Sequence, residues 1–198
     1  MKGLNILLME VIGTSHHPPL SLRVTSLLWG FFWSTVSAEH WRLTVAKPIR
    51  NSAKAIILHE GKLLAIRKKS NADEYFVLPG GGQEREETLA DAVKRECMEE
   101  TGVDVEVHDL LFIREYIGKN HEFAEFDSDL HQVEFFFHCT VKNPHGAANG
   151  AEPDRNQVGI AWLSVADIES TRLYPKGLRT HIAGINRGER TIYLGDIN

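Results

Sequence analysis

The sequence has little cysteine, no excess of positive charge and no hydrophobic run long enough to cross a bilayer. Its two cysteines, Cys97 and Cys139, form neither a metal-binding CxxC pair nor a disulfide framework. This pattern favours two buried thiols in a reducing, cytoplasmic compartment. The formal net charge of −5 lacks the basic excess typical of nonspecific nucleic-acid binding. A small anionic substrate stays compatible with this charge, because a bound metal ion can supply local positive charge.

The first 48 residues differ from the rest, because they carry three of the four tryptophans and show no regular alternation. Their apolar stretch 26–36 ends in small residues, an outline shared with signal peptides. Three interpretations stay open: an export signal, a helix that packs or touches a membrane without stable insertion, and an extension with no folded role. Four aromatic residues there would also suit a homodimer surface, namely Trp29, Phe31, Phe32 and Trp33. We expect an N-terminal extension over 1–48 and one folded domain over 49–198.

Beyond residue 50 the sequence predicts a mixed α/β (α+β) domain. Apolar runs bounded by turn residues predict strands over 53–58, 63–67, 75–78, 103–117, 132–141, 159–163 and 191–194. Helices are predicted over 88–101, over 165–169 with Ser164 as the N-cap, and from Pro175 to about residue 185. Helices among so many strands indicate a mixed sheet with helices packed on it.

The first predicted helix carries carboxylates on its apolar side. Thr88 is a favourable N-cap, and Gly102 is a favourable terminating glycine. At about 100° per residue, the core-facing side collects Leu89, Ala92, Val93 and Cys97. Glu96 and Glu100 fall in the middle of this side, and Glu99 falls at its edge. The helix therefore places negative charge where a core-facing stripe should be neutral.

A charge-rich helix usually presents a solvated face, but here two glutamates four residues apart share the apolar stripe. Like charges at that spacing repel each other. Partial burial raises the cost, because an unpaired carboxylate resists desolvation. Arg95 lies off the centre of the stripe, so a divalent cation is the better counter-ion. A set of oxygen ligands without histidine or cysteine suits Mg²⁺ or Mn²⁺ rather than zinc.

Three consecutive glycines, Gly80, Gly81 and Gly82, precede this helix. Glycine lets the backbone turn tightly and approach a ligand closely. A glycine run by itself is mostly a plain loop. A glycine loop just ahead of a carboxylate helix, however, can place phosphate oxygens beside a bound metal ion. The three glycines are therefore candidate substrate-binding residues.

The glycine run and the helix join into one pattern that resembles the Nudix box. The pattern is Gly81, five residues, Glu87, seven residues, and then the run Arg95-Glu96-Cys97-Met98-Glu99-Glu100-Thr101-Gly102-Val103. Every fixed position matches when Cys97 counts as the first apolar residue. The resemblance covers roughly residues 50–198. It implies a Nudix fold, in which a mixed β-sheet is sandwiched between helices.

The resemblance also implies an activity: cleavage of the pyrophosphate of a nucleoside diphosphate linked to another group. It implies that Gly80 offers its carbonyl to the metal, and that Glu87 and Arg95 orient the loop and the carboxylates. The metal ligands implied by the same resemblance are Glu96, Glu99 and Glu100. In such an enzyme water attacks a pyrophosphate phosphorus, metal ions lower the pKa of that water, and a carboxylate accepts its proton.

The general base and the substrate stay open. Glu96 and Glu99 are the candidates for the base within the box. Outside it Glu134 interrupts an apolar run, although the solvent side of an alternating strand is the simpler interpretation. Aromatic residues that could stack on a base, but that are usually core, are Phe76, Phe112 and Tyr116. The substrate is expected to be ADP-ribose-like, with modified nucleoside triphosphates, or nucleotide sensing without turnover, as the alternatives.

Overall fold

The computed structural model describes residues 47–70, 73–185, 187–188 and 191–198. The hypotheses made for residues 1–46, which include the export signal, the membrane-touching helix and the homodimer surface, lie outside the described residues. Within the described part of the chain, no helix is both long and apolar enough to span a membrane. The elements expected from residue 50 onward are the ones that can be compared with the structure.

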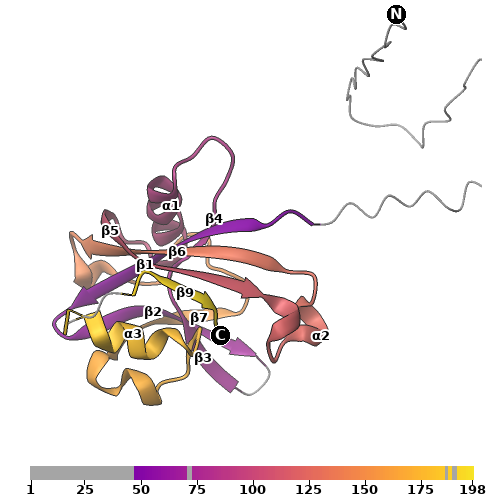
Figure 1. Cartoon of the computed structure of the whole chain (residues 1–198). Coiled ribbons are helices and arrows are strands. Elements are labelled where there is room, and N and C mark those ends of the chain that lie inside the picture. Colours follow the sequence, from indigo (N-terminus) through magenta and orange to yellow (C-terminus); the bar gives the residue numbers. More distant parts are fainter. Residues whose placement is uncertain (1–46, 71–72, 186, 189–190) are drawn as a thin grey trace, which may run out of the picture. The chain divides into compact units, whose positions relative to one another are not determined.

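The described residues form a mixed sheet of nine strands (Figure 1). Its main path runs β8–β3–β2–β1–β6–β5–β9, with β4 paired to β1 and β7 paired to β2. The pairs β1–β6, β3–β8 and β5–β9 are parallel, and the others are antiparallel. The strands are β1 (Arg50–His59), β2 (Lys62–Ser70), β3 (Asp73–Val77), β4 (Gly80–Gly82), β5 (Val105–Ile117), β6 (His131–Val141), β7 (Gln157–Ser164), β8 (Leu173–Tyr174) and β9 (Tyr193–Asp196).

Helices lie on both faces of this sheet, as expected (Figure 1). Alternate residues of β1 point to opposite faces. Ala55 and Ile57 join a core cluster with Val93 and Cys97 of α1 (Leu89–Thr101), whereas Ile56 joins a second cluster under α3. The second cluster includes Leu178 and Ile182, both from α3 (Leu178–Ile185). Because both faces of β1 are covered, its sequence is a nearly continuous apolar run.

The hairpin that starts the domain forms as predicted. Strands β1 and β2 pair antiparallel with Leu58 opposite Leu63. The turn between them holds Glu60 at φ 47° and Gly61 at φ 72°. Both residues are in the left-handed region, the geometry of a tight two-residue hairpin turn. The glycine at the second position adopts it without a steric penalty.

Several local predictions differ from the structure. The segment after Ser164 is a 3-10 helix, η4 (Val165–Ser170), and Ser164 makes no side-chain capping bond. Pro175 precedes rather than opens the last helix, which begins at Leu178. The segment between β5 and β6 adds two short helices, η2 (Gly118–Asn120) and α2 (Ala124–Asp127). A third 3-10 helix, η3 (Pro144–Gly146), follows β6. Such one-turn elements lack the periodic signal on which helix prediction depends.

The glycine run is a strand rather than a loop. Gly80 and Gly82 of β4 pair antiparallel with Lys54 and Ser52 of β1. At Gly80, where φ is 124°, a Cβ atom would overlap the carbonyl of Ala53. The approach of the two backbones therefore requires glycine at this position. This pairing places the entry to α1 directly beside the central strand.

Candidate active site

Helix α1 has the ends that its sequence predicts. The hydroxyl of Thr88 accepts a hydrogen bond from the backbone N–H of Asp91 at 3.2 Å. Gly102 ends the helix at φ 66°, and its N–H donates to the carbonyl of Met98 at 3.0 Å. Between these caps Ala92, Val93 and Cys97 are buried, whereas Met98 is 48% exposed. The apolar stripe thus faces the sheet. Glu96 and Glu100, which share this stripe, face β4, the strand of three glycines that we call the glycine strand.

Glu100 is the most deeply buried carboxylate of the helix, with 3% of its surface exposed. Its Oε2 accepts a hydrogen bond from the N–H of Gly80 at 2.8 Å. Burial raises the pKa of Glu100 to about 7, although the nearby Lys54 ammonium and the Gly80 N–H favour the charged form. A carboxylate in this setting is electrostatically unsatisfied, and a further positive charge beside it would stabilise the ionised form.

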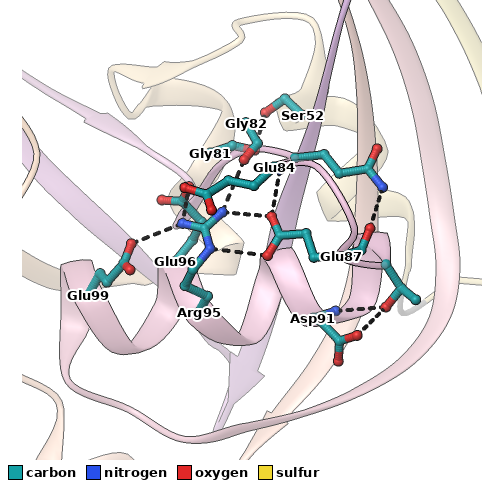
Figure 2. Close-up of polar contacts among 11 residues, drawn as sticks. Ser52, Gly81, Gly82, Glu84, Glu87, Asp91, Arg95, Glu96 and Glu99 are labelled. Atoms are coloured by element: carbon teal, nitrogen blue, oxygen red, sulfur yellow. Dashed lines mark hydrogen bonds and ion pairs between the residues drawn. The ribbon is translucent and has the colours of Figure 1, made fainter. Parts of the chain in front are cut away.

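Arg95 is the centre of a polar cluster that also contains Glu87, Glu96 and Glu99 (Figure 2). Its guanidinium holds Glu87 with two hydrogen bonds, from Nε at 3.2 Å and from Nη2 at 2.9 Å. Nη1 donates to Glu96 at 3.0 Å and to Glu99 at 3.1 Å. The hydrogen bonds to Glu87 raise the pKa of Arg95 above its ordinary value and lower that of Glu87. The single positive charge of Arg95 is therefore shared by three carboxylates.

The glycine strand forms the wall of this cluster. Nη2 of Arg95 donates to the carbonyl of Gly82 at 3.1 Å, and the hydroxyl of Ser52 donates to the carbonyl of Gly81 at 2.9 Å (Figure 2). A Cβ atom at Gly81 would overlap the carboxylate of Glu96. The absent side chain therefore leaves room for Glu96 against the strand. This arrangement brings all three predicted glycines next to the predicted carboxylates.

The oxygen groups expected to bind metal lie on α1 and β4, and two of the carboxylates, Glu96 and Glu99, are paired with Arg95. Among the described residues, no three acidic, histidine or cysteine side chains stand in an arrangement ready to hold a metal ion. Glu96 and Glu99 turn toward Arg95, and the Nζ of Lys54 contacts the carbonyl of Gly80. The donors are all oxygens and carry more negative charge than their partners neutralise. That chemistry fits a hard divalent cation such as Mg²⁺.

Sequence reasoning missed Lys54 and Asp154. Lys54 interrupts the apolar run of β1, and that interruption could have marked it as a candidate site residue. Asp154 lies in the loop before β7, pairs with Lys68 at 2.5 Å and also interacts with Glu100. Burial opposes its charge, but the hydrogen bond from Lys68 holds the pKa of Asp154 below its usual value. No local pattern marks this loop, because only the fold brings it to the end of α1.

The solvent-side interpretation of Glu134 is wrong. Glu134 is only 5% exposed, and its Oε2 accepts a hydrogen bond from Nε of Arg114 at 2.5 Å. The other carboxylate oxygen accepts from Gln132 at 2.7 Å. The register of β5 with β6 places Arg114 directly opposite Glu134. Both faces of β6 are covered, because Phe136 belongs to the core cluster under α3 and Cys139 to the cluster under α1. Two of the aromatics expected to be core are buried, namely Phe112 and Tyr116.

The sequence model of the NUDIX domain matches residues 48–182, well over half of the chain. The chain belongs to the Nudix hydrolase family. Among curated relatives, the MutT-like protein of Streptomyces ambofaciens is 45% identical over 58 residues. That stretch covers 29% of this chain and 36% of the relative, so the chain spans little more than a third of that protein. The Nudix box identified above lies inside the matched domain.

Solved structures of other Nudix proteins share the fold. A Nudix hydrolase from Nitrosomonas europaea superposes with a TM-score of 0.60 at 18% identity, covering 77% of this chain and 80% of that one. An ADP-ribose pyrophosphatase from Streptococcus suis superposes with a TM-score of 0.52 at 21% identity, covering 76% and 100% respectively. At these identities the likeness concerns the fold. The mixed sheet between helices is therefore the Nudix architecture, as the resemblance implied.

Proposed function

We propose that this Nudix domain, over residues 49–198, hydrolyses the pyrophosphate of a nucleoside diphosphate linked to a second group, with ADP-ribose-like compounds as the substrate class. The observation that carries the proposal is the excess of carboxylates around Arg95, pressed against a strand of glycines. Such a site can bring phosphate oxygens and divalent cations together. The similarity to a solved ADP-ribose pyrophosphatase supports the choice of substrate class. Buried Cys97 and Cys139 agree with the cytoplasm as the location.

Glu96, Glu99 and Glu100, with the carbonyl of Gly80, would hold Mg²⁺ or Mn²⁺. When bound, the ion neutralises phosphate charge and lowers the pKa of the attacking water. Arg95 keeps Glu96 and Glu99 in place through its two hydrogen bonds from Nη1. Arg95 is in turn fixed by its paired bonds to Glu87. These two sets of hydrogen bonds orient the donor oxygens before the substrate binds.

The glycine strand brings the substrate close to the carboxylates. Gly80, Gly81 and Gly82 present backbone without side chains, so a pyrophosphate can lie against it. Water then forms a bond to one phosphorus while the bridging P–O bond breaks, which yields two monophosphates. Glu96 or Glu99 would accept the proton of the water. Glu134 is not assigned as the base, because its two oxygens are engaged by Arg114 and Gln132.

The test compares hydrolysis of ADP-ribose, other nucleoside diphosphate derivatives and nucleoside triphosphates, with Mg²⁺, with Mn²⁺ and with chelator. We expect metal-dependent release of AMP from ADP-ribose. Glu100→Gln should reduce kcat by about 10³-fold, the size of a loss of several kcal/mol in charge stabilisation. Glu106→Gln, at an exposed position of β5, is the matched control and should keep full activity. Absence of cleavage across the panel, by a folded protein that binds metal, would reject the hydrolytic role.

A further inference from the structure

A pair of histidines connects β5 and β6, which run side by side in the sheet (Figure 1). The rings of His108 and His138 have centroids 5.2 Å apart, and their planes are inclined by 36°. Nε2 of His108 also lies 2.8 Å from the hydroxyl oxygen of Thr140. The proposed hydrolysis uses none of these three side chains, so the arrangement calls for its own interpretation.

The pairing of the two strands is irregular at this point. Two residues of β5, His108 and Asp109, lie across from a single residue of β6, His138. Such a two-against-one arrangement is a β-bulge, which redirects side chains and is frequent beside functional sites. The carboxylate of Asp109 is close enough to favour the protonated form of His138. The bulge therefore gathers two imidazoles and one carboxylate in a short stretch of the sheet.

The histidine pair lies on the face of the sheet opposite to α1. Cys139 packs in the core cluster under α1, and side chains alternate along a strand, so its neighbour His138 points to the other face. Phe136, two residues before His138, belongs to the cluster under α3 on that same face. The carboxylates of α1 are therefore separated from the two imidazoles by the sheet, and a ligand of one group is not a ligand of the other.

The surroundings of the two rings favour the neutral form that binds a metal ion. Partial burial and the nearby His108 lower the pKa of His138, although the Asp109 carboxylate acts in the other direction. A lowered pKa keeps the ring unprotonated, as metal binding requires. In its Nε2–H tautomer, His108 donates to the hydroxyl of Thr140 and keeps the Nδ1 lone pair for a ligand. Such a hydrogen bond from the second ring nitrogen is the usual support of a metal-binding histidine.

The separation of the rings fits two ligands of one ion. With metal–nitrogen distances of about 2.0–2.1 Å and a tetrahedral angle, two imidazoles on one ion have ring centroids roughly 5 Å apart. The separation of 5.2 Å between His108 and His138 agrees with this value. Imidazole nitrogens suit Zn²⁺, Cu²⁺ and Ni²⁺, whereas Mg²⁺ takes oxygen ligands. Since no three histidine, cysteine or acidic side chains surround such an ion in the described part of the chain, water would complete its coordination.

We propose that His108 and His138 form a second metal site, which binds a divalent transition-metal ion such as Zn²⁺ across β5 and β6. The inference does not rest on the proposed function, because its ligands, its face of the sheet and its preferred ions all differ from those of the carboxylate cluster. Closed structural zinc sites have four protein ligands, so a site with two should exchange its ion readily. An ion that binds only the folded protein stabilises it, and here it would join the two strands at the bulge.

The test is a calorimetric titration of the metal-free full chain with Zn²⁺ in a buffer that contains Mg²⁺. We expect a Zn²⁺-binding event that is lost in His108→Gln and in His138→Gln. Thr140→Val keeps the shape of the side chain without its hydroxyl, and should weaken this event by about 10- to 100-fold. Glu100→Gln should retain it, because Glu100 belongs to α1 on the other face of the sheet. The matched control is His59→Gln, because His59 is a half-buried strand histidine like His138.

Unchanged Zn²⁺ binding in both His108→Gln and His138→Gln would overturn the proposal. An equal loss in His59→Gln would also overturn it, because the effect would then be common to histidines of the sheet. A second measurement does not depend on the folding of any variant: NMR of the histidine rings in the wild-type protein. The ring signals of His108 and His138 should shift together on addition of Zn²⁺, and signals that stay unchanged at saturation would contradict the site.

Discussion

Arg114 and Arg95 both hold glutamates, and their surroundings differ in charge balance and in exposure. Arg114 pairs with Glu134 between β5 and β6, and the side chains are 8% and 6% exposed. Its Nη1 also donates to the carbonyl of Ile197 at 2.5 Å. In this region one positive charge meets one negative charge, and the neighbouring groups complete the hydrogen bonds. Such a pair is complete without a ligand.

Arg95 lies in the opposite situation. It contacts three carboxylates, those of Glu87, Glu96 and Glu99, and 26% of its side chain is exposed. Glu100 adds a fourth carboxylate nearby, kept in place by the N–H of Gly80. The number of carboxylates around each arginine therefore separates the balanced pair from the proposed site. A balanced pair stabilises the fold, whereas the excess of carboxylates around Arg95 is the charge that the proposed cation would neutralise.

The largest expected effect concerns the balanced pair. Arg114→Met should lower the free energy of unfolding by about 3–5 kcal/mol, because it leaves a buried carboxylate without its partner. The double variant Arg114→Met/Glu134→Met should recover most of that loss, since apolar side chains of similar volume can replace a buried pair. Urea denaturation measures both. A double variant no more stable than Arg114→Met would contradict the view that the pair is self-contained.

A smaller stabilisation should follow from adding the proposed cation to the Arg95 cluster. Mg²⁺ at about 100 times its dissociation constant should stabilise metal-free protein by about 2.7 kcal/mol. That corresponds to a rise in Tm of about 5–10 °C for a domain of this size. Thermal denaturation should show the rise in wild type and in Glu134→Gln, but not in Glu100→Gln. An equal rise in all three would place the cation elsewhere.

Substitutions in the glycine strand should separate an effect on activity from an effect on stability. In Gly81→Ala the new methyl group meets the flexible end of Glu96, so we expect less than about 1 kcal/mol of destabilisation. We also expect about a 10- to 100-fold loss of kcat, as for groups that orient a ligand. Gly80→Ala meets the backbone of Ala53 at φ 124° instead, and should mainly destabilise the fold. Steady-state kinetics and urea denaturation measure the two effects. A Gly81→Ala variant that keeps its activity but loses stability would contradict the prediction.

The smallest expected effect concerns a carboxylate outside both arginine regions. Burial opposes the charge of Asp196, but hydrogen bonds from Asn120, the Ile117 N–H and His121 lower the pKa of Asp196 to about 2. An unfolded Asp has a pKa of about 3.9. The charged form thus stabilises the fold above about pH 4, and this contribution is lost as the pH falls through 2. Asp196→Asn should be less stable than wild type at pH 7, with the difference shrinking toward pH 2.

The check on this last prediction is the pH profile of urea denaturation for the two proteins. A difference that stays constant from pH 7 down to pH 2 would show that the carboxylate acts without its charge. The same profile for Glu106→Gln provides the baseline, because Glu106 is exposed. If Glu106→Gln had the same pH profile of stability as Asp196→Asn, the profile would reflect a nonspecific effect of low pH on the fold.

Local spacing by itself determined α1 and the carboxylates on it. The capping residues Thr88 and Gly102 specify where that helix starts and ends, and the period of the helix places Glu96 and Glu100 on its apolar side. The hairpin at Gly61 follows from the same kind of short-range rule. These features depend on residues close together in the chain, so the order of residue types is enough to predict them.

Tertiary structure alone decided the surroundings of that helix. Lys54 reaches Gly80 because β1 pairs with β4, and Arg114 reaches Glu134 through the register of β5 with β6. The rings of Tyr75 and Phe123 meet that of Tyr174 because β3, β8 and the segment before α2 lie in one place. A one-residue shift in register would turn Lys54 or Arg114 to the opposite face of its strand. The Nudix box could be found in the sequence because its residues are close together in the chain. Its counter-charges depend on the folded sheet, because pairing between distant segments sets the register.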